Sequence, residues 1–380
     1  MSTGFLQSEY EARTAKAQAR MAQQGLAALL LTTEAEVRYF TGYMTRFWES
    51  PTRPWFVIVP AKGAPIAVIP AIGAAVMART WITDIRTWRA PDLTDDGVSL
   101  LAETLNECAG NGRVGIPDGH ETHVRMPYAD LLRLGEMIRG TITSDGAIIR
   151  GLRMVKSDAE IVKIREICAI AGRAFDRVPE IASASVPLDE VFRKFQILGL
   201  EEGADWVPYI AGASSSGGYD DVISPARATP LAVGDVLMLD TGMVRDGYFC
   251  DFDRNFSIGT PAPEIADAHA TLIDAVDAAA RIAKPGATAA MLFHAMDKIV
   301  TGGAGGSDAG RLGHGLGMQL TEWPSLIPDD HTSLEAGMVL TLEPGIQTSG
   351  GMLVHEENIV VTATGCEFVS PRYGREMVIL

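Results

Sequence analysis

The 380-residue chain contains little cysteine and no long hydrophobic run. No apolar stretch approaches the roughly 18 residues that a membrane-spanning helix needs, and the first twenty residues are too polar and charged for a signal peptide. We therefore expect neither a membrane protein nor a disulfide-stabilised secreted domain, and predict a cytoplasmic protein with reduced thiols. The four cysteines have neither metal-ligand nor disulfide spacing; they are Cys108, Cys168, Cys250 and Cys366.

Positive charge is also scarce, because 32 Lys and Arg residues face 48 Asp and Glu residues, a formal net charge of −16. Such a surface argues against nucleic acid or an anionic membrane as a partner, and leaves excess negative charge for bound cations. Hydrophobic residues make up 47% of the chain and charged residues 21%, which is typical of a folded globular protein. At this length we expect two domains.

The first part of the chain alternates predicted strands and helices. A helix over 9–25 precedes a buried strand over 26–33, and two β-branched strands within 56–70 flank a Lys-Gly turn, which predicts a hairpin. This alternation predicts an α/β domain over residues 1–152. We expect further strands over 80–90, 113–119 and 141–149 and helices over 95–110 and 124–138.

The second part begins with a long helix, for which Ser157 and Glu160 have capping-box spacing. Apolar residues recur on one face of this helix, and helices elsewhere surround pairs of strands, so we predict an α+β domain over residues 153–380. We expect helices over 188–202, 263–283 and 287–301 and strands over 205–211, 235–242, 247–257, 337–344 and 352–361.

Acidic residues stand within or beside the apolar strands of this second domain. Asp240 and Asp251 lie in VLMLDTGMVRDGYFCDFDRNFSIG, Glu343 in MVLTLEPGI and Glu356 after LVH, while His314 lies between glycines in GRLGHGLGM. Each alone has a simpler explanation, such as a solvent-facing strand position, a loop histidine or a strand-end cap. Carboxylates in a protein interior are paired, protonated or bound to metal. Together, four carboxylates and one imidazole match the ligand set and the charge of two divalent cations.

The order and spacing of these motifs resemble the pita-bread metallohydrolases, which include methionine aminopeptidase, Xaa-Pro dipeptidase, Xaa-Pro aminopeptidase and creatinase. In that family an Asp is followed eleven residues later by a second Asp three before an Arg, then by GHG-G, EPG and a Glu in a late strand. Residues 32–43 and 154–161 also resemble the prolidase and creatinase branch. The matching positions are Asp240, Asp251, Arg254, His314, Glu343 and Glu356.

The resemblance implies a creatinase-like N-terminal α/β domain over 1–152, a pita-bread C-terminal domain over 153–380 and a homodimer. It implies that Asp240 binds one metal ion, that His314 and Glu343 bind the other, and that Asp251 and Glu356 bridge them. His314 and Glu343 are then the catalytic residues, with Glu343 moving a proton between a metal-bridging hydroxide and the leaving nitrogen. The metals implied are two Mn ions, with Co, Fe or Zn as alternatives. We predict a dinuclear hydrolase of a small peptide or peptide-like amide, resembling Xaa-Pro dipeptidase.

The chain departs from the family pattern around the substrate. Proline-directed peptidases have a histidine where this chain has Thr321, and another about seventeen residues before the first Asp, where this chain has none. A creatinase-like hydrolase or a lyase of a small nitrogenous or zwitterionic metabolite therefore stays open, and so does a non-catalytic binding module. Asp253 stands at a position that is usually Thr in the family, and we interpret it as a support for the ligands or a partner of Arg254.

Aromatic and basic residues suggest where a substrate binds. Tyr219, Thr321 and Trp323 lie near the metal motifs, and Arg46 and Arg53 lie among tryptophans in TRFWESPTRPWF. An Arg beside a Trp can hold a carboxylate or stack on a cationic group. The alternative for the Arg and Trp residues is a domain or dimer interface, where both types are enriched.

Overall fold

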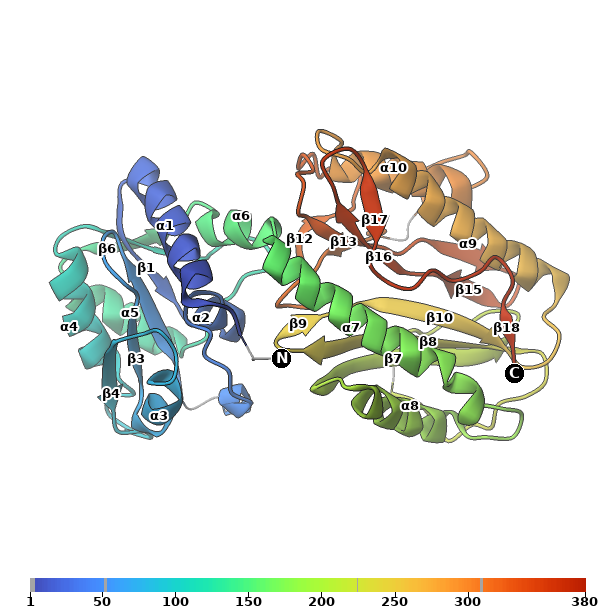
Figure 1. The fold of residues 1–380 in the computed structure, drawn as a ribbon, viewed down its shortest axis with the longest axis horizontal. Coiled ribbons are helices and arrows are strands. Elements are labelled where there is room, and N and C mark those ends of the chain that lie inside the picture. Colours follow the sequence, from blue (N-terminus) through green and yellow to red (C-terminus); the bar gives the residue numbers. More distant parts are fainter. Residues whose placement is uncertain (1–3, 51–52, 224, 308–309) are drawn as a thin grey trace. The chain divides into compact units, whose positions relative to one another are not determined.

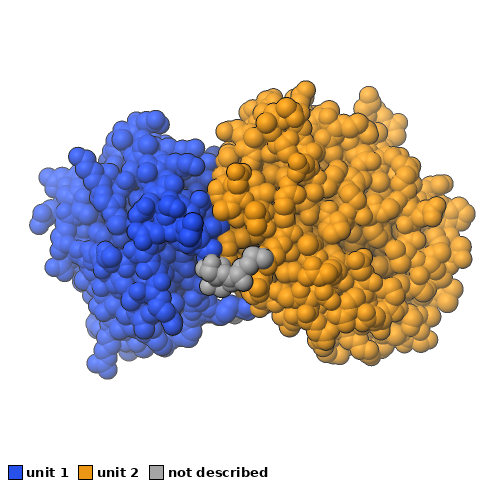
Figure 2. All heavy atoms as spheres, in the orientation of Figure 1, with its two compact units in different colours: residues 1–153 blue, residues 154–380 orange. Residues whose placement is uncertain are grey.

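A computed structural model describes residues 4–50, 53–223, 225–307 and 310–380. The chain divides into two compact units, residues 1–153 and 154–380 (Figure 2). Unit 1 is α/β and unit 2 is α+β, which confirms the predicted fold class. No described helix is long and apolar enough to cross a membrane.

Unit 1 is built on a six-stranded sheet of order β4-β3-β2-β1-β5-β6, in which β2 is antiparallel to both β1 and β3 and the other pairs are parallel (Figure 1). The predicted hairpin over 56–70 is confirmed. The elements are α1 (Gln7–Gln24), β1 (Leu26–Leu31), α2 (Glu34–Thr41), η1 (Phe47–Glu49), β2 (Phe56–Pro60), β3 (Ile66–Pro70), η2 (Ala71–Gly73), α3 (Ala74–Met77), β4 (Asp84–Trp88), α4 (Val98–Ala109), β5 (Arg113–Ile116), α5 (Tyr128–Met137), β6 (Thr141–Ser144) and α6 (Ile148–Met154).

Three α-helices of unit 1, α2, α3 and α6, were not expected, and side-chain caps explain α2 and α6. Helix α2 begins with a capping box, in which the Thr33 side chain accepts a hydrogen bond from the Glu36 backbone N–H and the Glu36 carboxylate accepts one from the Thr33 backbone N–H. The strand predicted over 141–149 ends at Ser144, because the Asp145 carboxylate accepts hydrogen bonds from the backbone N–H groups of Ala147 and Ile149 and starts α6 there.

Unit 2 contains two five-stranded sheets and one hairpin. The first sheet has the order β18-β10-β8-β7 with β9 on β8, the second has the order β12-β11-β13-β16-β17, and β14 pairs with β15. The elements are α7 (Asp158–Asp176), η3 (Val178–Glu180), α8 (Leu188–Glu202), β7 (Trp206–Ser216), β8 (Asp235–Arg245), β9 (Tyr248–Phe249), β10 (Phe252–Ser257), α9 (Pro263–Ile282), α10 (Ala289–Val300), β11 (His314–Gly315), β12 (Glu322–Ser325), β13 (Val339–Leu342), β14 (Gly345–Thr348), β15 (Gly351–Val354), β16 (Glu357–Val361), β17 (Cys366–Phe368) and β18 (Val378–Ile379).

Helices cover both sheets of unit 2. Helices α7 and α8 lie along the first sheet, and the apolar faces of α9 and α10 pack on β13 and β16 of the second (Figure 1). Two predicted strands are interrupted, the one over 247–257 at residues 250–251 and the one over 352–361 at residues 355–356. Each interruption contains one of the predicted metal ligands.

Candidate metal centre

Two of the predicted ligands come from the first sheet of unit 2. Asp240 lies in β8, opposite Asp253 of β10 and Ala211 of β7. Asp251 lies just before β10 and is buried. The antiparallel pairing of β8 with β10 therefore brings residues eleven apart in the sequence to the same place on the sheet.

His314 comes from β11 of the second sheet, and its glycine neighbours allow the close packing there. Gly313 has a φ of +145°, and a Cβ at this position would lie 2.3 Å from the Thr341 carbonyl oxygen. The Nδ1 atom of His314 lies 2.8 Å from the Gly315 carbonyl oxygen. A carbonyl accepts but does not donate, so Nδ1 carries the proton and Nε2 is left with a lone pair for a metal.

The remaining two predicted ligands lie at the ends of strands of the second sheet. Glu343 comes directly after β13 and Glu356 directly before β16. The Nε2 atom of His314 lies 3.4 Å from Oδ2 of Asp251 and 3.9 Å from Oε1 of Glu343. One ligand atom each from Asp251, His314 and Glu356 lies within 4.8 Å of the others. Segments more than one hundred residues apart thus supply one cluster.

Burial and mutual repulsion dominate the electrostatics of this cluster. Burial, and then the charges of Asp251 and Asp253, raises the pKa of Asp240 well above its usual value. Burial likewise raises the pKa values of Asp251 and Glu356 well above their usual values, and that of Glu343 to about 7. Burial therefore disfavours the ionised form of these carboxylates when no cation is near, so the cluster favours positive charge.

The donor set fits two divalent cations. The buried oxygens Oδ1 of Asp240 and Oε1 of Glu356 have no hydrogen-bond partner. Burying an oxygen in this way costs free energy unless a ligand binds it. The four carboxylates carry four negative charges, which two divalent ions balance, and the oxygen-rich set with one imidazole suits Mn, Co, Fe or Zn. The residues available to hold the ions are Asp240, Asp251, His314, Glu343 and Glu356.

Two residues that the sequence did not single out also belong to this cluster. The Tyr209 hydroxyl on β7 donates to Oδ2 of Asp240 at 3.0 Å. Nε of Arg311 lies 3.6 Å from Oε1 of Glu343, and the Arg311 charge acts against the raised pKa values of Asp251 and Glu343. The position of Arg311, three residues before His314, could have marked it as a site residue, whereas no feature of the sequence around Tyr209 could have done so.

Asp253 is a support of the ligand backbone rather than the ion-pair partner of Arg254. Its Oδ1 atom accepts a hydrogen bond of 2.8 Å from the backbone N–H of Glu356. The Arg254 guanidinium instead pairs with Glu357 at 3.1 Å. Although burial of Glu357 opposes the shift, Arg254 and His355 lower the pKa of Glu357 to about 2.

The three predicted substrate residues of unit 2 lie in different settings. Thr321 is half-buried and accepts a hydrogen bond of 3.3 Å from Arg311, which places it beside the cluster. The Trp323 indole N–H donates to Thr332 at 2.9 Å. Tyr219 is fully buried in the core, and its hydroxyl donates a hydrogen bond to the side-chain oxygen of Asn255. For Tyr219 the geometry indicates a structural role, while the substrate contacts of Thr321 and Trp323 stay predictions.

Arg46 and Arg53 belong to unit 1. Arg46 is exposed, and the Arg53 guanidinium lies over the Phe47 ring at 4.8 Å. Residues 51–52 of the same segment lie outside the described residues. The predicted substrate contacts of both arginines stay predictions.

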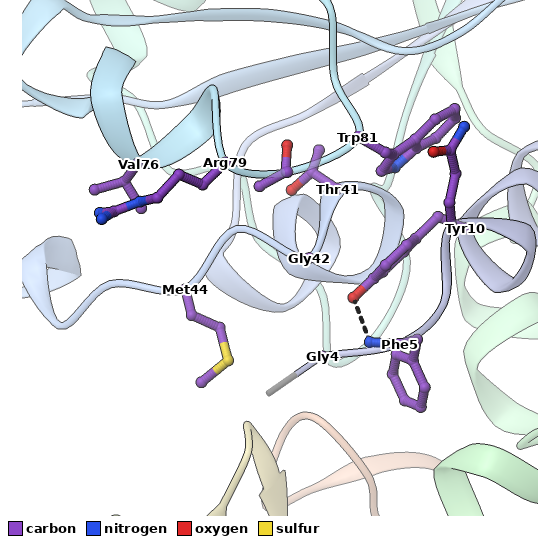
Figure 3. A pocket seen from close by; sticks show the side chains of 11 residues that line it. Gly4, Phe5, Tyr10, Thr41, Gly42, Met44, Val76, Arg79 and Trp81 are labelled. Atoms are coloured by element: carbon purple, nitrogen blue, oxygen red, sulfur yellow. Dashed lines mark hydrogen bonds between the residues drawn. The ribbon is translucent and has the colours of Figure 1, made fainter. Parts of the chain in front are cut away.

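Unit 1 also contains a pocket of about 480 Å³, lined in part by Tyr10, Arg79 and Trp81 (Figure 3). Its aromatic polar groups already have partners, since the Tyr10 hydroxyl accepts from the Phe5 backbone N–H and Trp81 donates to the Phe40 carbonyl. Among the described residues, the group that could hold a metal lies in unit 2. We therefore assign the chemistry to unit 2.

Comparisons with known proteins agree with this assignment. The family model described as "Metallopeptidase family M24" matches residues 162–363, and the one described as "Creatinase/Prolidase N-terminal domain" matches residues 13–155. The "Probable dipeptidase PepE" of Mycobacterium tuberculosis is 28% identical over 362 residues, which cover 93% of this chain and 92% of that protein. The "Xaa-Pro dipeptidase" of Pyrococcus horikoshii is 31% identical over 236 residues, which cover 61% of this chain and 66% of that protein.

A solved structure extends the likeness to the whole chain. The crystal structure of dipeptidase PepE from Mycobacterium ulcerans has a TM-score of 0.85 at 28% identity, and the match covers 99% of both chains. The family model covers more than half of the chain, including all five predicted ligands. The protein is a member of metallopeptidase family M24, with a creatinase/prolidase N-terminal domain before its catalytic domain.

Proposed function

We propose that this protein is a dinuclear metallohydrolase that cleaves a dipeptide or a peptide-like amide, in the manner of an Xaa-Pro dipeptidase. The observation that carries the proposal is the cluster of Asp251, His314 and Glu356, whose ligand atoms lie within 4.8 Å of one another. Unpartnered buried oxygens of Asp240 and Glu356 support it, and so do the dipeptidase names of relatives that match nearly the whole chain.

Each residue has a role that follows from its geometry. Two divalent ions held here would activate water and polarise the scissile carbonyl. Glu343, whose carboxylate lies 3.9 Å from Nε2 of His314 at the edge of the cluster, would take a proton from the attacking water and return it to the leaving nitrogen. The Tyr209 hydroxyl fixes the Asp240 carboxylate through its hydrogen bond, and the half-exposed Arg311 places a positive charge beside Glu343.

Finer features of the proposal rest on composition and on the family resemblance. We propose Mn as the native metal because the donor set is rich in oxygen. We propose a cytoplasmic location because the four described cysteines are free thiols. A homodimer is the assembly that the resemblance implies.

The test is turnover by protein loaded with two equivalents of Mn and given Gly-Pro, Ala-Pro and Ala-Ala. We expect release of proline from the first two, and a fall of at least about 100-fold on Glu343→Gln, because general acid–base groups contribute about 10² to 10⁴. The control is Tyr248→Phe, which removes a hydrogen bond to Glu160 elsewhere in unit 2 and should leave turnover unchanged. If the Mn-loaded protein leaves all three dipeptides intact, the peptidase assignment is wrong.

A second function is favoured by Thr321, which stands where peptidases of this family place a histidine. A creatinase-like hydrolase or a lyase would act on a small nitrogenous or zwitterionic metabolite. The same Mn-loaded protein should then release product from creatine-like, betaine-like or ectoine-like compounds and not from dipeptides. A non-catalytic module would bind fewer than two metal ions after incubation with Mn.

A further inference from the structure

The two predicted bridging ligands, Asp251 and Glu356, lie outside the hydrogen-bonded ladders of their sheets. Asp251 lies between β9 and β10, and Glu356 lies between β15 and β16. A residue in such a break lacks the ladder bonds that fix a strand residue. Other contacts of its backbone must then fix the position of its side chain.

Those contacts come from side chains, and they are reciprocal. The side chain of Asn358, two residues after Glu356, accepts from the Asp251 backbone N–H at 3.0 Å and donates to the Asp251 carbonyl. The side chain of Asp253, two residues after Asp251, accepts from the Glu356 backbone N–H at 2.8 Å. Arg254 donates to the Glu356 carbonyl at 3.1 Å. Each break is thus closed by side chains from the strand that follows the other ligand.

A buried histidine lies between Asp253 and a second carboxylate. Nδ1 of His355 lies 3.3 Å from Oδ1 of Asp253, and Nε2 lies 3.4 Å from Oε1 of Glu357. All three side chains are at most 1% exposed. Glu357 is itself fixed by Arg254 and by the backbone N–H of Tyr373 at 3.0 Å. The imidazole therefore lies between two anchored carboxylates and has little room to move.

We propose that Asp253 and Asn358 are positioning residues for the metal centre, forming a reciprocal clamp on the backbones of Glu356 and Asp251, and that His355 acts through Asp253. The inference rests on the proposed function, because it requires that Asp251 and Glu356 hold metal. Replacing either clamp residue keeps the ligand carboxylate in the sequence but removes the hydrogen bonds that hold the ligand's backbone. Supports of this kind are worth about 10- to 100-fold in metal affinity.

The experiment measures Mn binding to the full-length chain by titration calorimetry, together with the electron paramagnetic resonance signal of a coupled Mn pair. The variants are Asp253→Ala, Asn358→Ala, His355→Ala and the double variant Asp253→Ala/His355→Ala. Asp253→Asn is the conservative variant, because its amide oxygen can still accept from Glu356. Tyr248→Phe is the matched control, because it also removes a hydrogen bond of a buried side chain in unit 2.

We expect Asp253→Ala and Asn358→Ala to weaken binding of at least one Mn by about 10- to 100-fold and to reduce the coupled-pair signal at metal concentrations that saturate the parent. Asp253→Asn should restore part of the affinity. The double variant should bind Mn no more weakly than Asp253→Ala alone, because His355 acts through Asp253. Tyr248→Phe should lower the Tm without changing Mn affinity.

Parental affinity and a parental pair signal in both Asp253→Ala and Asn358→Ala would overturn the clamp, whatever their Tm values. Additive losses in the double variant would overturn the role of His355. Fewer than two Mn bound to the parent chain would instead refute the proposed function, and the clamp with it.

Discussion

Replacing Glu343 by Gln should make the metal-free protein more stable at alkaline pH. Burial raises the pKa of Glu343 from 4.5 to about 7. Between these two values the folded state holds a proton that the unfolded state has lost, so the stability of metal-free protein falls as the pH rises and stays low above pH 7. At about 1.4 kcal/mol per pKa unit, the ionised carboxylate costs about 3 kcal/mol. Gln carries no charge and avoids this cost.

The assay is urea unfolding followed by circular dichroism, at pH 5 and pH 8, with a chelator present throughout. We expect the free energy of unfolding of Glu343→Gln to exceed that of the parent by about 2–3 kcal/mol at pH 8 and by less than about 1 kcal/mol at pH 5. Glu335→Gln, at an exposed acid of unit 2, is the matched control and should change stability by less than about 0.5 kcal/mol. Equal stability of Glu343→Gln and the parent at pH 8 would refute the reasoning that burial strains this carboxylate.

Three further predictions concern the surroundings of the centre. Lys156→Met should destabilise the protein by about 3–5 kcal/mol in calorimetry, because it removes the ammonium group that lies 3.0 Å from the buried Glu322 carboxylate. Adding Glu322→Gln should recover part of the loss, and no recovery would contradict the ion pair. Tyr209→Phe should weaken Mn binding about 10-fold in calorimetric titration, by releasing Asp240; unchanged affinity would contradict its role. Gly313→Ala should lower the Tm and weaken Mn binding, because its Cβ would meet a carbonyl oxygen at 2.3 Å; a normal Tm would contradict the crowding.

Much of the fold was predictable because its strands and helices follow simple patterns. The hairpin over 56–70 has β-branched strands on both sides of a turn, and α7 begins at the capping box of Ser157 and Glu160 that the sequence indicated. Helix α2 was missed although Thr33 and Glu36 have the same spacing, since eight residues contain too few turns for a clear period. The two-residue strands β11 and β18 carry no pattern of their own.

The sequence indicated the five candidate ligands and a supporting role for Asp253, but not the other contacts that hold the site. Asp240, Asp251, His314, Glu343 and Glu356 stand in short motifs whose order is distinctive, and their roles as ligands stay a prediction that metal binding will test. The contacts that hold them are made across long stretches of chain. The bond between Asp251 and Asn358, for example, joins residues 107 positions apart, and sequence spacing alone does not encode such a pairing.

The sequence by itself indicated the chemistry that we propose for this protein, because the number and type of its predicted ligand side chains set which cations they can balance. The tertiary structure decided where the strands break, so that Asp251 and Glu356 leave their ladders and are held instead by Asn358 and Asp253. The physical reason is that strand pairing and burial depend on which distant segments meet, and the raised pKa values of the acids exist only once folding has removed water from around them.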